Sequence, residues 1–221
     1  MKTRRFAFFV LAITSVILGG WICSPVTIIP PANLINPVSI YLVDYGFHGR
    51  LVLPINRDKC LEYAYGDWRY FALNQQDWLT GAAALFLPTQ GALGRKLKNC
   101  DRFDLLATQK DSSLLSITVE KAKVDRLLKV LNSYFDRPAT LQIKNSHTGM
   151  TLVPYDRTYT VIHNSNHELV RWLQDLGCRV EGFVLWANFQ ISDQLPVTSY
   201  QLPVTVEQQL TTNNQQQMTN D

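Results

Sequence analysis

Hydrophobic and polar positions follow two kinds of spacing along the chain, and each spacing predicts a type of element. Short apolar or alternating runs predict β-strands. They occur at 38–43, 50–54, 60–65, 104–108, 114–120 and 183–190, with a further strand pair at 139–144 and 150–153. The glycine-containing segment 45–49 lies between the first two runs, so it predicts a turn that joins two neighbouring strands.

Apolar residues that recur at i, i+3 and i+4 predict helices instead. The clearest stripes lie at 121–135 and 166–176, and a shorter helix is predicted at 75–86, where Pro88 would stop it. Gly177 is a natural C-terminal stop for the helix at 166–176. Strands and helices in this mixture, with a hairpin among them, predict an α+β fold.

The first long apolar run predicts a membrane anchor. Residues 6–23 are 18 residues without a charge, and a helix of that length spans about 27 Å, close to the hydrocarbon thickness of a bilayer. Basic residues precede the run and no charge follows it before Asp44, so the N-terminus is predicted in the cytoplasm and the remainder on the exported side of a single-pass membrane protein. A cleavable signal peptide and a buried core helix are the alternatives. Cleavage of a signal peptide after Gly19 or Gly20 would leave no small residue at position −3. A buried core helix usually shows a polar face, which this run lacks.

Changes in composition divide the rest of the chain. After the anchor at 1–23, residues 24–37 form a proline-rich spacer that we expect to be extended. Residues 38–192 contain the predicted strands and helices and form one domain. Of the final 29 residues, 15 are Gln, Thr or Asn, and this composition predicts a disordered tail at 193–221.

Charge changes the picture only at the N-terminus. Hydrophobic residues make up 46% of the chain and charged residues 18%, a composition that excludes a wholly disordered protein. Lys2, Arg4 and Arg5 together equal the formal net charge of +3, so the remainder of the chain is neutral. The basic run at 95–98 is interpreted as a solvated loop, and no nucleic-acid partner is predicted.

The cysteines allow one disulfide outside the anchor. Cys23 lies in the apolar run, and Cys60, Cys100 and Cys178 follow it. Three cysteines can form at most one intramolecular bond, and spacing alone does not choose the pair. No C-x-x-C motif is present, so thioredoxin-like and zinc-knuckle sites are excluded.

The segment HNSNH at 163–167 offers two kinds of chemistry. His163 and His167 are spaced for one helix face, but no carboxylate with a familiar spacing completes a metal site, and neither a metal nor another cofactor is predicted. Ser165 with Glu168 fits a capping box at the start of the last helix. A helix N-terminus also suits a nucleophile, because its N–H groups can hold an oxyanion, so the position alone leaves both roles open for Ser165.

A base and its orienting group are also available. His48 lies in the glycine-flanked turn, and Glu62 lies on the next predicted strand. In nucleophilic catalysis the base must reach the nucleophile, while a third group orients the base. His48 and Glu62 can fill those two roles, although a surface histidine and a solvated glutamate are the more common interpretation.

Two blocks of sequence carry a family resemblance. The segments IYLVDYGFHGRLVLP (40–54) and EYAYGDWRYF (62–71), followed by the Leu-Pro-Thr of 87–89, are similar to a bacterial family of unknown function first noted near urease operons. The first block matches at Gly46, His48 and Gly49, and the second at Glu62, Gly66 and Asp67. A Thr-Cys-Asn motif of the family corresponds to Asn-Ser-Asn at 164–166. The resemblance covers roughly 40–190.

The order of these blocks also resembles circularly permuted papain-like hydrolases, which include cell-wall peptidases and acyltransferases. This resemblance implies one papain-like α+β domain with a mainly antiparallel sheet, in which His48 is the base, Glu62 the orienting group and residue 165 the nucleophile. Where those hydrolases have Cys, this chain has Ser165, and a serine hydroxyl is not ionised by a helix N-terminus as a thiol is. We therefore expect a membrane-anchored, exported domain with a degenerate hydrolase-like site whose role is mainly binding or structural, with the membrane and a component of the cell envelope as its partners. The alternative is an active serine hydrolase or acyltransferase that acts on a cell-envelope substrate.

Overall fold

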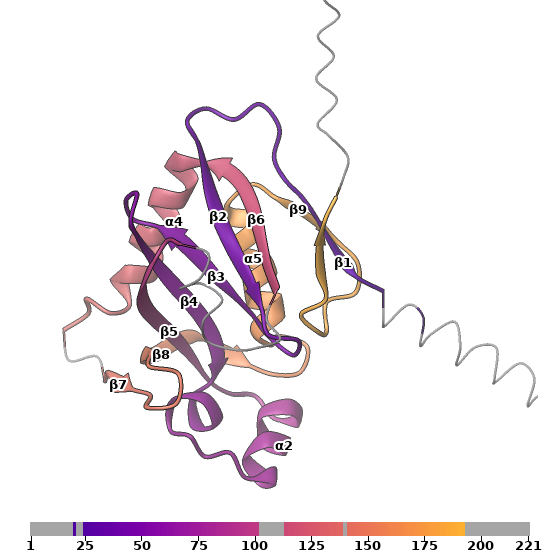
Figure 1. Cartoon of the computed structure of the whole chain (residues 1–221). Coiled ribbons are helices and arrows are strands. Elements are labelled where there is room, and N and C mark those ends of the chain that lie inside the picture. Colours follow the sequence, from indigo (N-terminus) through magenta and orange to yellow (C-terminus); the bar gives the residue numbers. More distant parts are fainter. Residues whose placement is uncertain (1–19, 21–23, 102–112, 139–140, 193–221) are drawn as a thin grey trace, which may run out of the picture.

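The centre of the fold is an antiparallel sheet of seven strands in the order β6-β2-β3-β4-β5-β8-β7 (Figure 1). The computed structural model describes residues 20, 24–101, 113–138 and 141–192. The strands are β2 (Pro37–Asp44), β3 (Gly49–Pro54), β4 (Lys59–Asp67), β5 (Thr89–Asn99), β6 (Ser113–Glu120), β7 (Ile143–Lys144) and β8 (Thr151–Tyr159). The turn between β2 and β3 has Gly46 at a φ of 84°, which explains why glycine stands there, because side chains disfavour positive φ.

A second sheet joins the two ends of the described chain. Its strands are β1 (Val26–Ile29), β9 (Arg179–Glu181) and β10 (Phe189–Ile191), in the order β10-β1-β9. β1 runs parallel to β10 and antiparallel to β9. The segment that the sequence analysis interpreted as an extended spacer therefore contributes a strand, and the predicted strand at 183–190 is reduced to three residues at its end.

Two amphipathic helices cover one face of the large sheet. They are α4 (Lys121–Ser133) and α5 (Ser165–Asp175), which confirm the helices predicted at 121–135 and 166–176. The strand register places Leu42, Leu51 and Tyr63 side by side, and they pack in one core with Leu131 of α4 and Trp172 of α5. All five side chains are at least 99% buried, and each large apolar side chain buried in this way contributes roughly 1.5–3 kcal/mol.

The connection between β4 and β5 forms a separate structure at one end of the sheet. It contains η1 (Trp68–Ala72), a short π-helical turn, and α2 (Trp78–Phe86). Asp67 caps the first and Asp77 caps the second. In Figure 1 α2 lies at the lower end of the molecule, beyond the ends of β4 and β5. The helix predicted at 75–86 is thus confirmed, with its start moved to the residue that follows its aspartate cap.

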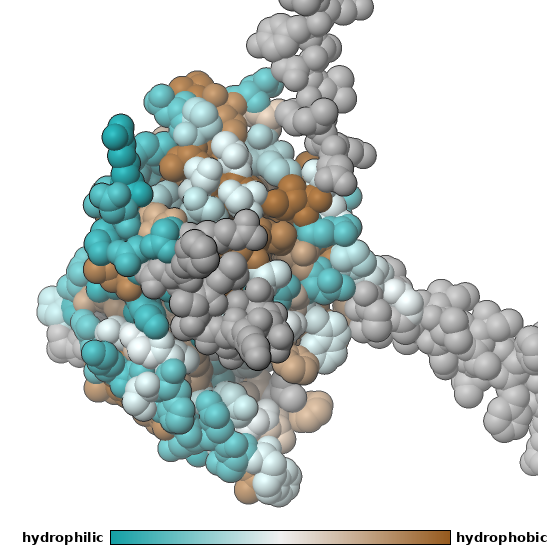
Figure 2. Space-filling view, viewed as in Figure 1, coloured by the Kyte–Doolittle hydropathy of each residue, from teal (hydrophilic) through white to brown (hydrophobic). Residues whose placement is uncertain are grey.

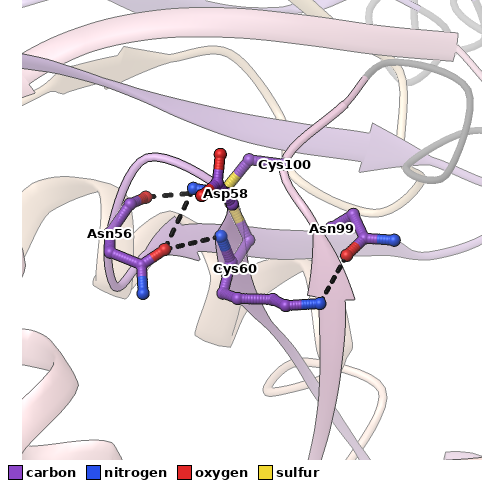
Figure 3. The surroundings of a disulfide bond; sticks show 6 residues. Asn56, Asp58, Cys60, Asn99 and Cys100 are labelled. Carbon is purple, nitrogen blue, oxygen red and sulfur yellow. Dashed lines mark hydrogen bonds between the residues drawn. A yellow bond between two sulfur atoms is a disulfide. The ribbon is translucent and has the colours of Figure 1, made fainter.

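A disulfide fastens the opposite end of β4 to β5 (Figure 3). It joins Cys60 to Cys100, and Cys178 is free and buried. Cys60 pairs with Lys98 in the β4–β5 ladder, and Cys100 follows Asn99, the last residue of β5. The Cα atoms of the two cysteines are 5.3 Å apart. The strand register therefore selects one of the pairings that the sequence left open.

The predicted fold class, a transmembrane helix followed by one papain-like α+β domain, is wrong for the described part of the chain. Those residues are mostly β-sheet, with 42% in strands and 24% in helices. The main reason is β5, which includes the basic run 95–98 that the sequence analysis interpreted as a loop. Arg95 lies over the ring of Phe135 and bonds to Asn132, and these partners are distant in the sequence.

Some predictions fall outside the described residues. The anchor at 6–23 does so except for Gly20, and so do the strand at 104–108 and the tail at 193–221. In the ranges that are described, no helix has both the length and the apolar character needed to cross a membrane.

Hydrophilic residues make up much of the face shown in Figure 2, with hydrophobic residues in separate patches among them.

Candidate functional site

A pocket opens at the end of the sheet where α2 lies. Its volume is about 340 Å³, which is within the size range of small-molecule sites. Five distant segments meet there: the β2–β3 turn, the end of β4 with η1, α2, the end of β8 and the first residue of α5. The lining residues are Phe47, His48, Gly49, Ala64, Tyr65, Gly66, Asp67, Tyr70, Phe71, Gly81, Ala84, Tyr159 and Ser165.

Most of this lining is aromatic or apolar. Five aromatic side chains come from three of the segments, and no lysine or arginine is among the described lining residues. The polar groups are His48, Asp67, Ser165 and the hydroxyls of the tyrosines. A few polar groups in an apolar cavity are the usual composition of a site that binds and orients a small molecule.

The structure brings two of the three predicted catalytic residues to this pocket. His48 and Ser165 both line it, whereas Glu62 does not. Glu62 is fully buried, and its Oε1 accepts hydrogen bonds from the Tyr45 hydroxyl at 3.2 Å and from Nη1 of Arg50 at 3.5 Å. The Tyr45 ring stacks on the imidazole of His48 at 5.5 Å. Glu62 therefore holds the aromatic neighbour of His48, and its described hydrogen bonds do not orient the imidazole itself.

His48 is a weak base in this setting. Burial and, to a lesser extent, the positive charge of Arg50 together lower the pKa of its imidazole to about 4. The imidazole is consequently neutral at physiological pH. A general base acts best when its pKa lies near the working pH, so this environment does not favour proton abstraction from Ser165.

Ser165 is the first residue of α5 rather than its cap. Asn164 is the N-cap, and its Oδ1 accepts from the backbone N–H of Asn166 at 3.0 Å and of His167 at 3.2 Å. The predicted capping box at Ser165 and Glu168 is therefore wrong by one position. The asparagine before Ser165 takes the capping role, which leaves the serine hydroxyl available to the pocket.

Tyr159 is the described partner of Ser165. The pKa of the Tyr159 phenol is raised mainly by burial and then by the negative charge of Asp67, while hydrogen bonds from the Ser165 backbone N–H and hydroxyl lower it in part. The phenol is thus bonded to the head of α5 and feels the charge of the Asp67 carboxylate. Sequence analysis missed this residue, because tyrosines in a strand usually serve as core.

Asp67 carries a carboxylate oxygen without a described partner. The residue is 4% exposed. Its Oδ1 accepts from the backbone N–H of Tyr70 at 2.7 Å, whereas its Oδ2 is buried and makes no hydrogen bond. A buried unpaired acceptor costs free energy unless a ligand or water supplies a donor. The family resemblance included Asp67, but its sequence context gave it no role.

Asn166 positions the turn that carries His48. Its Oδ1 accepts from the backbone N–H of Gly49 at 3.0 Å, and its Nδ2 donates to the carbonyl of Phe47 at 3.0 Å and to that of Leu185 at 3.2 Å. Asn166 is 1% exposed. It therefore fixes the backbone on both sides of His48 against the head of α5. The sequence gave no signal for this contact, which joins residues 117 positions apart.

The histidines at 163 and 167 take part in other contacts. Nε2 of His163 lies 3.3 Å from Oε2 of the fully buried Glu168, and Nδ1 of His167 lies 2.9 Å from Oδ1 of Asn164. Glu168 also accepts from the Tyr155 hydroxyl at 2.8 Å and from Nε of Arg171 at 3.0 Å. This network ties α5 to β8. Within the described ranges, no three side chains of the metal-binding types come together.

Comparisons with known proteins give no relative from which a function could be transferred: no family model matches the chain, and neither a curated protein nor a solved structure does.

Proposed function

We propose that this chain is a binding protein of the cell envelope whose pocket takes a small organic ammonium ion with an apolar body. The observation that carries the proposal is the unpaired Oδ2 of Asp67, a buried carboxylate oxygen of a residue that lines an aromatic pocket. An ammonium N–H would supply the missing donor once the Asp67 side chain turns this buried oxygen toward the pocket, and hydrogen bonds to charged groups are the stronger kind.

The rest of the lining supports a cation. Tyr65, Tyr70 and Phe71 line the pocket together with Asp67, and the negative face of an aromatic ring attracts an ammonium group by about 0.5–2 kcal/mol. No described lysine or arginine in the lining competes for the carboxylate. His48 remains neutral because its pKa is lowered to about 4, so it does not repel a cation at neutral pH.

The same proposal keeps the domain on the exported side of a membrane. The uncharged run at 6–23 with basic residues before it supports an uncleaved anchor. The bond between Cys60 and Cys100 agrees with this location, because disulfides persist in oxidising compartments and are rare in the cytosol.

Binding of phenethylamine tests the ligand class. Titration of the full chain is expected to show that phenethylamine, which is protonated at neutral pH, binds more tightly than 2-phenylethanol, its neutral analogue. Asp67→Asn should weaken phenethylamine binding by roughly tenfold to a hundredfold, the loss expected for one charged hydrogen bond. The variant should still fold, because asparagine has the same Oδ1 acceptor to cap η1 and is as good an N-cap as aspartate.

Asp77→Asn is the matched control, since Asp77 caps α2 in the same way but does not line the pocket. It should leave binding unchanged. Equal binding of the amine and the alcohol, or an Asp67→Asn variant with unaltered affinity, would contradict the proposed ligand class.

A serine hydrolase is the second candidate, because His48 and Ser165 line one pocket. In that reaction the Ser165 hydroxyl would attack an ester or amide carbonyl while His48 takes its proton. The C–O or C–N bond would then break, His48 would give the proton to the departing alcohol or amine, and an acyl-enzyme would form. A serine-reactive fluorophosphonate distinguishes the two candidates. Stoichiometric labelling that is lost in both Ser165→Ala and His48→Ala would favour the hydrolase, and the low pKa of His48 leads us to expect no labelling.

A further inference from the structure

Helix α2 has no polar face. Its sequence is WLTGAAALF, and no charged residue occurs in the 17 positions from Trp78 to Gly94. Three of its large side chains are nevertheless exposed: Trp78 by 77%, Leu79 by 61% and Phe86 by 79%. A helix that is apolar all round is normally buried in a protein core or in lipid, so this surface requires a cover.

The apolar surface continues past the helix. An open hollow of about 450 Å³ beside α2 is lined by Leu79, Phe86 and Leu87, with Arg69 at its side. Leu87 is 59% exposed and follows the last residue of the helix. The guanidinium of an arginine beside apolar side chains can reach lipid phosphates while its stem stays among them. Aromatic residues with apolar neighbours are also the composition of interfacial membrane segments.

The predicted anchor enters the domain at the start of β1, and a series of contacts leads from there toward α2. Only Ser24 and Pro25 separate the anchor, which ends at residue 23, from β1. The N–H of Val26 donates to the carbonyl of Asn188 at 2.7 Å, and the N–H of Ala187 donates to the carbonyl of Gly46 in the β2–β3 turn at 3.2 Å.

The β2–β3 turn and α2 line the same pocket. Phe47, the next residue of the turn, lines the pocket together with Gly81 and Ala84 of the helix. Phe47 is itself 76% exposed and packs edge-on against Trp186, which is 44% exposed, with 6.0 Å between ring centroids. The start of β1 is therefore linked through the turn to the pocket whose wall α2 helps to form, and both the turn and α2 carry exposed aromatic side chains.

We propose that α2 lies against the lipid bilayer on the exported side, with Trp78, Leu79 and Phe86 among the headgroups and upper acyl chains. The proposal rests on the predicted anchor and is independent of the ligand of the pocket. A domain held two residues from a membrane helix meets the bilayer at a high effective concentration. This favours lipid over a second copy or a soluble partner as the cover of α2.

Quenching by bromine-labelled lipid tests the contact. The full chain is reconstituted in vesicles of phosphatidylcholine and phosphatidylglycerol, in which part of the phosphatidylcholine carries bromine high on its acyl chains. The share of tryptophan quenching that disappears in Trp78→Phe belongs to Trp78, which separates it from Trp21 in the anchor. We expect Trp78 to account for a clear share of the tryptophan quenching. In Leu79→Glu/Phe86→Glu the ratio of chains with α2 in the bilayer to chains with α2 out of it should fall on the order of tenfold or more, because two apolar side chains are lost from the contact.

The matched control is Leu97→Glu/Val130→Glu. Leu97 is 60% exposed and Val130 is 48% exposed, and Leu97 lies toward the disulfide end of β5. This variant should keep the Trp78 share. Neither Leu79 nor Phe86 lines the pocket, so phenethylamine binding should be unchanged in the α2 variant, and the two proposals can fail separately.

Two results would overturn the proposal. One is a Trp78 that bromolipid does not quench while Ala82→Cys chains crosslink to each other, which would assign α2 to a second copy. The other is an unquenched Trp78 without crosslinking, which would leave the helix for a protein partner. If the double glutamate variant does not fold, the comparison of wild type with Trp78→Phe alone decides between these outcomes.

Discussion

Asn166 joins the head of α5 to the turn that carries His48, and it shows how the pocket depends on single residues. Its amide is the kind of group that can satisfy an N–H and two carbonyls at once. Ser165, beside it, is the residue that the sequence singled out. The resemblance identified the right segment, but the structure divides capping, clamping and pocket lining among Asn164, Asn166 and Ser165.

The titration of His48 gives a prediction at the residue scale. Its pKa is about 4 in the folded protein, against an ordinary value of 6.5. Between these values the unfolded chain binds the additional proton, so the stability that depends on neutral His48 is complete above about pH 6.5 and is lost as the pH falls toward 4. The full loss is up to about 3 kcal/mol.

Urea unfolding of wild type and His48→Asn at several pH values checks this. The wild type should lose more stability than the variant on acidification through this range. Equal losses would mean that His48 titrates normally in the folded protein.

Gly91 in β5 and Gly81 in α2 differ in the space that each leaves for a side chain. A Cβ on Gly91 would lie 2.2 Å from the carbonyl oxygen of Arg157 and 2.7 Å from the Tyr65 ring, where β5 shifts register against β8. Gly91→Ala should therefore destabilise the protein by roughly 3 kcal/mol or more, as overpacking against backbone does.

Gly81 in α2 is the matched position, because the nearest atom to its added Cβ is a carbon of the Tyr70 ring at 3.7 Å. Gly81→Ala should stabilise by about 0.5–1 kcal/mol, since alanine is the better helix former. Thermal unfolding of both variants measures the difference. Similar melting temperatures would show that the β5–β8 contact relaxes.

Prediction from sequence succeeded where an element carries its own pattern. α4 and α5 have apolar stripes that appear in any helical projection, and the β2–β3 hairpin has a glycine at the turn position that requires it. β5 lacks such a pattern in its second half, where Leu97 is the one apolar residue among Arg95, Lys96 and Lys98. Its place in the sheet depends on β4 and β8, which a local pattern does not show.

The same limit applies to the whole molecule. The fold class was predicted from the types of elements, but a seven-stranded sheet is defined by pairings between distant segments. The pocket could also be predicted only in part. His48 could be proposed from its position in a turn, and Ser165 from its position at the start of a helix. The roles of Asp67 and Tyr159 required the geometry, because an aspartate that ends a strand normally reads as a turn residue.

The Cys60–Cys100 bond gives a prediction for the whole molecule. It closes a loop of 40 residues, and a loop of that length restricts the unfolded chain enough to stabilise the folded one by roughly 2–4 kcal/mol. Chemical unfolding should therefore require less urea when a reductant is present. The Cys60→Ala/Cys100→Ala variant should not respond to the reductant, and a response there would assign the effect to another cysteine.

The position of β1 between β9 and β10 has a consequence for biosynthesis. Thr27 and Gln190, which share a hydrogen bond, are 163 residues apart. β1 therefore leaves the ribosome well before β9 and β10 and can pair with them only after a delay on the order of ten seconds at ordinary translation rates. Throughout that time its edges are unpaired. A chaperone that protects unpaired strand edges would therefore act on this protein chiefly at its beginning, and truncation before residue 189 would leave β1 without its parallel neighbour.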